Sequence, residues 1–485
     1  MLQDKSYKLT NENSFELEPA DNNFTGIGGS ADFEELEERD INPPSALLPN
    51  KSSPDVENDE ETIDNDNFIQ NITNENLRKS TLFMAFMNMT NSILGAGVIG
   101  LPLAIRNTGL IGGVLAIIML TLLVDWTLRL IVINLKLSSK TTYQDFVEYT
   151  LGKWGKFLIL ISNGLFAVGG CIGFCIIIGD TIPHVLRAFF PDHSEWFHRN
   201  IIIVLVTVFI SYPLSLNRDI SKLSNTSFLA IISMLVIIFM VLLRGPVTAD
   251  SYKGSFSNSS IFILPSFFQG VSVISFALVC HHNTSFIYFS IRNPSLKRFN
   301  RMTHISCFVS MIALFIMGFS GFGIFKDKTK GNILNNFPSN DNYINVARFC
   351  FGFNMLTTFP LEVFVLRDVI RDLLYFNVHS DTPVELSSML HFTVTTIIVL
   401  ITMGISLTTC NLGALLELVG ATTASLMAYI LPPYCNLKLI GNNKTLWEKK
   451  RHYFCIFFGF AVLIISTTQT IISAIKSSEE KHCIV

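Results

Sequence analysis

Long apolar stretches recur through most of this sequence, and they limit its possible folds more than any other feature. From residue 80 onward, stretches of about 18 residues or more alternate with charged or Pro- and Gly-containing breaks, which is the length that a helix needs to cross a ~30 Å hydrocarbon layer. The pattern predicts an all-α polytopic membrane protein. We expect eleven transmembrane helices, at 80–104, 108–134, 155–179, 199–216, 222–243, 261–288, 303–325, 344–368, 388–409, 411–437 and 452–476.

The residues before the first apolar stretch have a different composition. Residues 1–79 contain 19 of the 38 acidic residues but only 6 of the 35 basic ones, a local balance of −13. They offer too little apolar area to offset the entropy cost of ordering the backbone. We therefore expect a disordered acidic tail at 1–79, with a short helix near Phe33 only on a partner, a transmembrane domain at 80–476 and a short C-terminal tail at 477–485.

The basic residues of the loops predict the orientation. Nineteen Lys and Arg fall on the side of the N-terminus and eleven on the other, which favours a cytoplasmic N-terminus because cytoplasmic loops carry the excess of basic residues. No basic patch with interleaved aromatic residues is present, so we expect no nucleic-acid partner. No zinc-binding His pair, nucleophile elbow or phosphate-binding loop occurs, so we expect no enzyme activity, no cofactor and no structural metal.

The first apolar stretch is unusual for a membrane helix. Gly95, Gly97 and Gly100 lie within six residues, and each weakens a helix by about 1 kcal/mol relative to Ala. Polar residues between Asn88 and Ser92 precede them. We predict that this segment is unwound around a cavity, where free N–H groups would face a carboxylate and free carbonyls a cation. The alternative is a glycine-rich packing face, which accounts for Gly97 and Gly100 but not for the polar cluster.

The sixth apolar stretch contains a candidate counterpart. His281 and His282 follow an apolar run, and imidazoles can relay protons near neutral pH. Alternatively, they mark the point where the span meets water. No glycine signals a break here. Phe276, in the same stretch, has two interpretations, core packing or contact with a substrate.

Few acidic residues fall within the apolar stretches. They are Asp125, Glu362 and Glu417, with Asp180 at the edge of one. Each costs free energy in hydrocarbon unless it is paired or faces water. Asp125 lies four residues before Arg129, which predicts an ion pair on one helix. For Glu417, small neighbouring residues favour a structural hydrogen bond to an adjacent helix.

Glu362 has no such partner nearby. Its nearest basic residue is five positions on, while Asn354 and Thr358 precede it at steps of four and form a polar stripe beside Pro360. A carboxyl group in this position could bind and release a proton as its access alternates between the two sides. The alternative is a residue that extends toward the membrane interface.

Several segments resemble a known family. They are 86–109 (FMNMTNSILGAGVIGLPLAIRNTG), the Cys-His-His-Asn of 280–283 and the Thr-Thr-Phe-Pro-Leu-Glu of 357–362. These resemble the amino acid/auxin permease family, especially the branch of the sodium-coupled neutral amino acid transporters and the fungal vacuolar amino acid transporters. The resemblance covers 80–476 and implies a LeuT-like fold, with five spans, an inverted repeat of five and one more. The first and sixth spans would be the broken helices.

The resemblance also implies roles for individual residues. The amino acid would be bound by Thr90, Asn91, Gly95, Ala96 and Gly97 on one side, and by Phe276 and Cys280 on the other. Ion coupling would involve Asn91 and Thr358, which make a sodium site possible, with Glu362 for protons. His281 is a further candidate for proton coupling from its residue type rather than from the resemblance.

The implied function is secondary active transport of amino acids, and we expect neutral amino acids as the substrates. It would run by proton-coupled alternating access in a vacuolar or other endomembrane, with the amino acid, H⁺ and the lipid bilayer as partners. The alternatives are an amino acid sensor that uses the same site and a sodium-coupled symporter.

Overall fold

A computed structural model describes residues 80–218, 226–376, 385–440 and 445–476, so the predicted tails at 1–79 and 477–485 lie outside it. Within those ranges the chain is helical and no strand forms beyond an isolated pairing of Ser80 with Ile291. Nine helices there are long and apolar enough to cross a membrane, and two shorter apolar helices occupy Arg199–Ser215 and Phe228–Arg244. The prediction of an all-α polytopic membrane protein is confirmed.

The α-helices, in chain order, are α3 (Leu82–Ile93), α4 (Leu101–Thr108), α5 (Leu110–Ser138), α6 (Tyr143–Leu151), α7 (Lys153–Phe189), α8 (Arg199–Val206), α9 (Tyr212–Ser215), α10 (Thr226–Arg244), α11 (Phe267–Leu278), α12 (Thr284–Ser290), α13 (Leu296–Phe325), α14 (Asn342–Leu374), α15 (Ser388–Thr408), α16 (Leu412–Val419), α17 (Leu431–Ile440), α18 (Leu446–Ala461) and α19 (Thr467–Lys476).

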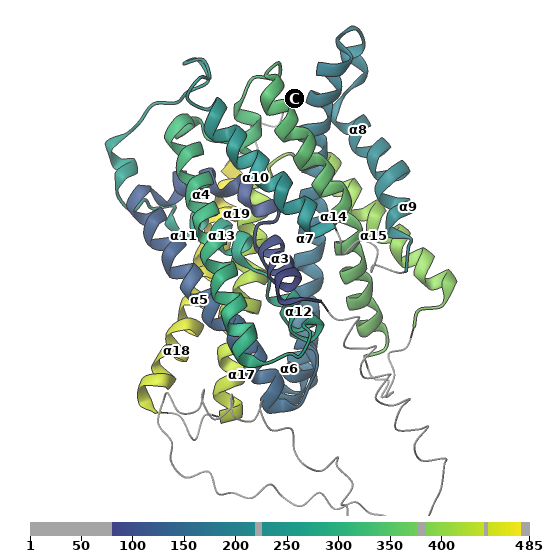
Figure 1. Ribbon diagram of the computed structural model, residues 1–485, viewed down its shortest axis with the longest axis vertical. Coiled ribbons are helices and arrows are strands. Elements are labelled where there is room, and N and C mark those ends of the chain that lie inside the picture. The colour runs from purple at the N-terminus through teal and green to yellow at the C-terminus, as the bar shows by residue number, and fades with distance from the viewer. Residues whose placement is uncertain (1–79, 219–225, 377–384, 441–444, 477–485) are drawn as a thin grey trace, which may run out of the picture.

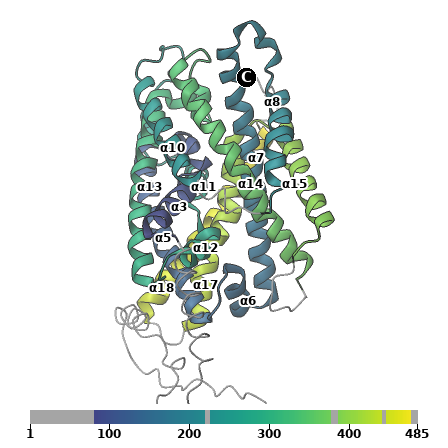
Figure 2. The same cartoon turned by 45° about the vertical axis from the view of Figure 1, so that its right-hand side comes forward.

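Two long helices organise the bundle. α7 and α14 run side by side through its centre and make the most extensive contact between any two described elements (Figure 1). In both views α8 and α15 lie on one side of them, and α5, α11 and α13 lie on the other (Figure 2). α9 follows α8 on its side in Figure 1. Glu362 belongs to α14, and the two interrupted helices belong to the α5, α11 and α13 side.

Most predicted spans coincide with a helix, but some boundaries were wrong. The span predicted from residue 261 begins only at Phe267, because Pro265 has no N–H to donate and the apolar residues before it form a short 3₁₀ turn and a loop. The third span extends to Phe189, through Pro183, rather than ending at 179. The tight turn predicted at Asn411 is confirmed, since its side chain accepts a hydrogen bond from the N–H of Ala414 and caps α16.

Candidate substrate and ion site

The first apolar span is interrupted where its glycines lie. α3 ends at Ile93, Leu94 and Gly95 leave helical geometry, and a 3₁₀ turn (η2, Ala96–Gly100) leads into α4. The predicted break is therefore confirmed. The glycines also pack closely, because a Cβ atom on Gly97 would lie 2.6 Å from the Cα atom of Ala277. The break lies at Leu94 and Gly95, whereas Gly97 belongs to a packing face of the same segment.

The sixth span is interrupted as well, without a glycine. α11 ends at Leu278, Val279 is extended (φ −78°, ψ 113°), and a 3₁₀ turn (η7, His281–Asn283) precedes α12. The sequence signal for this break was weak because no helix-breaking residue type marks it. Extended geometry at a β-branched residue such as Val279 carries little cost.

The two interruptions face each other. The thiol of Cys280 lies 3.4 Å from the sulfur of Met89, and the side-chain amide of Asn283 donates to the hydroxyl of Ser92 at 3.4 Å. α3 and α12 lie next to each other in both ribbon views (Figures 1 and 2). Segments nearly 200 residues apart in the chain therefore meet at one place, since the hydrogen-bonded Asn283 and Ser92 are separated by 191 positions.

Polar atoms around this meeting point are buried without hydrogen-bond partners. They are the Thr90 hydroxyl oxygen, Nδ1 of His281 and Nδ1 of His282. An unpaired buried polar group costs roughly 1–3 kcal/mol, so a polar ligand that bonded these three atoms would be favoured here.

Thr127 holds the ring of His281. Its hydroxyl lies 2.9 Å from Nε2 of His281 and also 2.9 Å from the carbonyl oxygen of Leu123. When the hydroxyl donates to that carbonyl, the ring proton lies on Nε2 and Nδ1 is the acceptor. Nδ1 is buried and has no hydrogen-bond partner among the described residues.

The remaining predicted substrate residues differ in exposure. Ala96, Gly97 and Cys280 are buried, while Asn91 and Gly95 are half-buried. Phe276 is 9% exposed, and its ring packs against that of Phe166 of α7 in a tilted arrangement, with the centroids 5.4 Å apart. It therefore packs in the core and also lies one turn before the break.

Glu362 lies on α14, facing α7. Its carboxyl oxygen Oε2 is buried and has no hydrogen-bond partner. A Cβ atom on Gly170 of α7 would lie 3.7 Å from Cγ of Glu362, so the absence of a side chain there makes room for the carboxyl group. The acid is thus directed at the central helix within the bundle.

The candidate sodium ligands are not joined. Thr358 donates to the carbonyl of Asn354 at 2.8 Å, as a helix-interior threonine commonly does. Within the described ranges no hydrogen bond links Asn91 to Thr358.

The other membrane acids have partners. Glu417 accepts from Asn107 at 3.0 Å, from Thr470 at 3.2 Å and from Gln269 at 3.4 Å. The predicted structural hydrogen bonding of Glu417 to neighbouring helices is confirmed. Its two oxygens hold three segments against α16.

Asp125 forms the predicted pair with Arg129, at 2.9 Å. It has a second partner, Nδ1 of His304 on α13, also at 2.9 Å, which no residue spacing in the sequence indicates. Asp180 is buried and accepts from Asn335 at 2.9 Å, with Arg199 at 3.5 Å. Among the acids singled out in the spans, Glu362 therefore stands apart as the one with a buried oxygen and no ion pair or hydrogen bond recorded.

With this geometry in place, comparison with known proteins decides the family. The family profile described as "Transmembrane amino acid transporter protein" matches residues 78–472. The chain belongs to this family. The membership confirms the resemblance and the expectation that the chain is not an enzyme, because the family is named for transport.

Relatives of this transporter carry concordant names. It is 57% identical over 426 residues to "Vacuolar amino acid transporter 2" of Saccharomyces cerevisiae, covering 86% of this chain and 89% of the relative. It is 34% identical to "Putative sodium-coupled neutral amino acid transporter 11" of Danio rerio, covering 80% and 85%. It is 25% identical to "Amino acid transporter AVT6E" of Arabidopsis thaliana, covering 82% and 85%.

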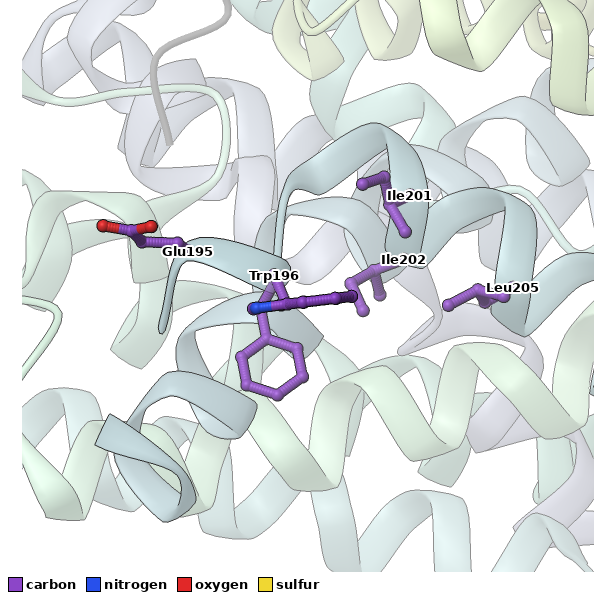
Figure 3. Close-up of a pocket in the computed structure, with 6 residues that line it drawn as sticks. Glu195, Trp196, Ile201, Ile202 and Leu205 are labelled. Carbon is purple, nitrogen blue, oxygen red and sulfur yellow. The ribbon is translucent and has the colours of Figure 1, made fainter. Parts of the chain in front are cut away.

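The transporter also has a surface hollow away from these residues. It measures about 570 Å³, lies at the start of α8 and is lined by Glu195, Trp196, Phe197, Ile201, Ile202 and Leu205 (Figure 3). None of the predicted site residues lines it. It therefore contributes nothing to the candidate site.

Proposed function

We propose that this protein is a proton-coupled amino acid transporter of the vacuolar membrane that works by alternating access. The observation that carries the proposal is the meeting of the two interrupted spans, with unpartnered polar atoms around them. The name of the yeast relative, at 57% identity, supports the vacuolar membrane and the amino acid substrate.

The proposed architecture has eleven spans arranged as a LeuT-like inverted repeat of five plus one. In the part of the chain that the structure describes, nine helices reach spanning length, and the two shorter ones would be the fourth and fifth spans. A helix such as Arg199–Ser215 rises about 25 Å at 1.5 Å per residue, close to the ~30 Å hydrocarbon thickness. The two interrupted helices are the first and the sixth spans, as this arrangement requires.

The amino acid would bind between the two interruptions. The end of α3 presents free carbonyls, and the turn after it presents free N–H groups, which suit an ammonium and a carboxylate respectively. Thr90, Asn91, Gly95, Ala96 and Gly97 form one side of this site, and Phe276 and Cys280 form the other. The apolar surroundings would favour amino acids with neutral side chains.

Glu362 is the proposed site of proton coupling. Burying a carboxylate without a partner costs free energy, and protonation removes most of that cost. A group that is stable as a neutral acid when closed in, and ionised when open to water, ties proton uptake to the conformational change. Nδ1 of His281 is the second candidate acceptor.

Sodium coupling through Asn91 and Thr358 remains the competing proposal, and the name of the zebrafish relative favours it. A cytoplasmic N-terminus, an acidic cytoplasmic tail at 1–79 and a short tail at 477–485 complete the proposal. They rest on the distribution of charge in the sequence.

Flux in proteoliposomes tests this function. Purified full-length protein should accumulate a labelled neutral amino acid when a pH gradient is imposed without Na⁺. If accumulation instead requires a sodium gradient, the coupling ion is Na⁺ and not H⁺. Specific amino acid binding with no flux, in a preparation shown to be folded, would favour a sensor and overturn the transporter proposal.

A further inference from the structure

The central helix α7 presents an almost bare surface to its neighbours on the side of the site. Gly169, Gly170 and Gly173 are buried there, opposite side chains of α14 and α16. One turn before Gly170 and on the same face stands Phe166, which is 7% exposed. Phe166 is thus the large side chain that borders the glycine face of α7.

The ring of Phe166 spans the break in the sixth span. It lies 5.4 Å from the ring of Phe276, which precedes the break, and 5.0 Å from the ring of His282, which follows it. Both planes are tilted, at 31° and 45°, as in ordinary aromatic packing. The non-helical residues Val279 and Cys280 lie between these two contacts.

Phe166 is also close to groups that have no partner. His282, in contact with it, has a buried and unpartnered Nδ1. Gly170, one turn further along α7, faces the unpartnered carboxyl of Glu362. The ring therefore lies on the face of α7 that is turned both to the proposed amino acid site and to the proposed coupling acid.

We propose that Phe166 forms one wall of the amino acid pocket and limits the size of the side chain that the pocket accepts. This proposal rests on the proposed function, because it names a residue that determines specificity in the same site. Contacts with Phe276 and His282 restrict the movement of the ring away from a larger substrate. Replacing it with a smaller side chain creates space beside these two rings.

Removing part of the ring should therefore change selectivity rather than only lower activity. In Phe166→Leu and Phe166→Ala, transport of large apolar amino acids such as leucine and phenylalanine should gain on transport of alanine. The ratio of kcat/KM values should shift by about tenfold, since a methylene or two in an apolar pocket is worth this much or more. Phe166→Tyr keeps the ring and should retain the order of preference of the unchanged protein.

The experiment is a competition panel of small and large neutral amino acids, run on full-length protein in liposomes. Phe325→Leu is the matched control, because Phe325 is a fully buried ring at the end of α13, away from the sixth span, and packs on Phe337 with the centroids 4.9 Å apart. It should lower expression or melting temperature without changing the order of preference.

An unchanged order of preference in an active Phe166→Leu protein, or the same shift in Phe325→Leu, would overturn the role of Phe166. If Phe166→Ala does not fold, Phe166→Leu and Phe166→Tyr still decide the matter. Failure of the unchanged protein to transport any amino acid would instead contradict the proposed function.

Discussion

Glu362 and Glu417 are the same residue type, both placed in membrane-spanning helices that pack on α7, yet their surroundings are opposite. Glu417 accepts hydrogen bonds from Asn107, Thr470 and Gln269, which come from three separate helices. Glu362 faces Gly170 and has a buried oxygen with no partner. The first carboxyl holds the bundle together, whereas the second is free to change its protonation state without breaking a contact.

The largest effect should follow from Glu362→Gln, which keeps the shape but cannot take up a proton. Accumulation driven by a pH gradient should fall by about 5- to 150-fold, the factor that corresponds to typical coupling free energies of about 1–3 kcal/mol. It should no longer depend on the gradient. Exchange of labelled for unlabelled substrate should persist, because no hydrogen bond of the fold is lost. Counterflow and gradient-driven uptake in liposomes measure the two properties.

If Glu417→Gln abolished gradient-driven accumulation as Glu362→Gln does, the two carboxyl groups would not differ in role. We expect that variant to accumulate substrate. Undiminished accumulation in Glu362→Gln would remove Glu362 from the coupling mechanism.

Removing the carboxyl of Glu417 should affect stability first. In Glu417→Ala the side chains of Asn107, Gln269 and Thr470 lose their acceptor in a buried setting, at a cost of roughly 1–3 kcal/mol for each group that finds no substitute. A lower melting temperature and lower yield from detergent extraction are expected. Thermal unfolding of purified protein, with Glu362→Ala as the matched control, should show the larger loss for Glu417.

Thr127→Val should have an intermediate effect, because it changes a residue that contacts His281 of the proposed site. Nε2 of His281 loses its hydrogen-bond partner, which costs about 1–3 kcal/mol if that nitrogen stays buried and unpaired, and the imidazole is no longer held in one orientation. We expect a higher KM for substrate and a changed pH profile of transport. Thr121→Val is the control, since Thr121 donates only to the carbonyl of Ile117. Equal effects of both variants would contradict a specific role for the Thr127–His281 bond.

The smallest effect should come from His304→Gln. Asp125 keeps Arg129 at 2.9 Å, and His304 is 52% exposed, so the lost contact is worth about 1 kcal/mol or less. Transport and melting temperature should change little. A loss as large as that of Glu362→Gln would show that partnered acids also carry function, and the distinction drawn between the two glutamates would fail.

The sequence allowed the helices and the first break to be predicted, because both depend on local composition. Length and apolarity marked the spans, and three close glycines marked the interruption before α4. The break at Val279 and Cys280 carries no such signal, since its geometry is imposed by packing against Met89 and other residues far away in the chain.

The same limit applied to single residues. That Glu417 would find structural partners could be inferred, but which partners could not. Phe166 and His304 were missed because an aromatic ring or a histidine in an apolar run looks like any other until its neighbours on a distant helix are known.

The short pairing of Ser80 with Ile291 has a mechanical consequence. Two backbone hydrogen bonds, from Ser80 N–H to Ser290 at 2.9 Å and from Arg292 N–H to Ser80 at 3.0 Å, clasp the entrance of α3 to the exit of α12. α3 and α12, one half of each interrupted span, are therefore tied together at these ends. The polypeptide that precedes residue 80 joins the chain at this pairing, so a pull on it would act on both halves at once.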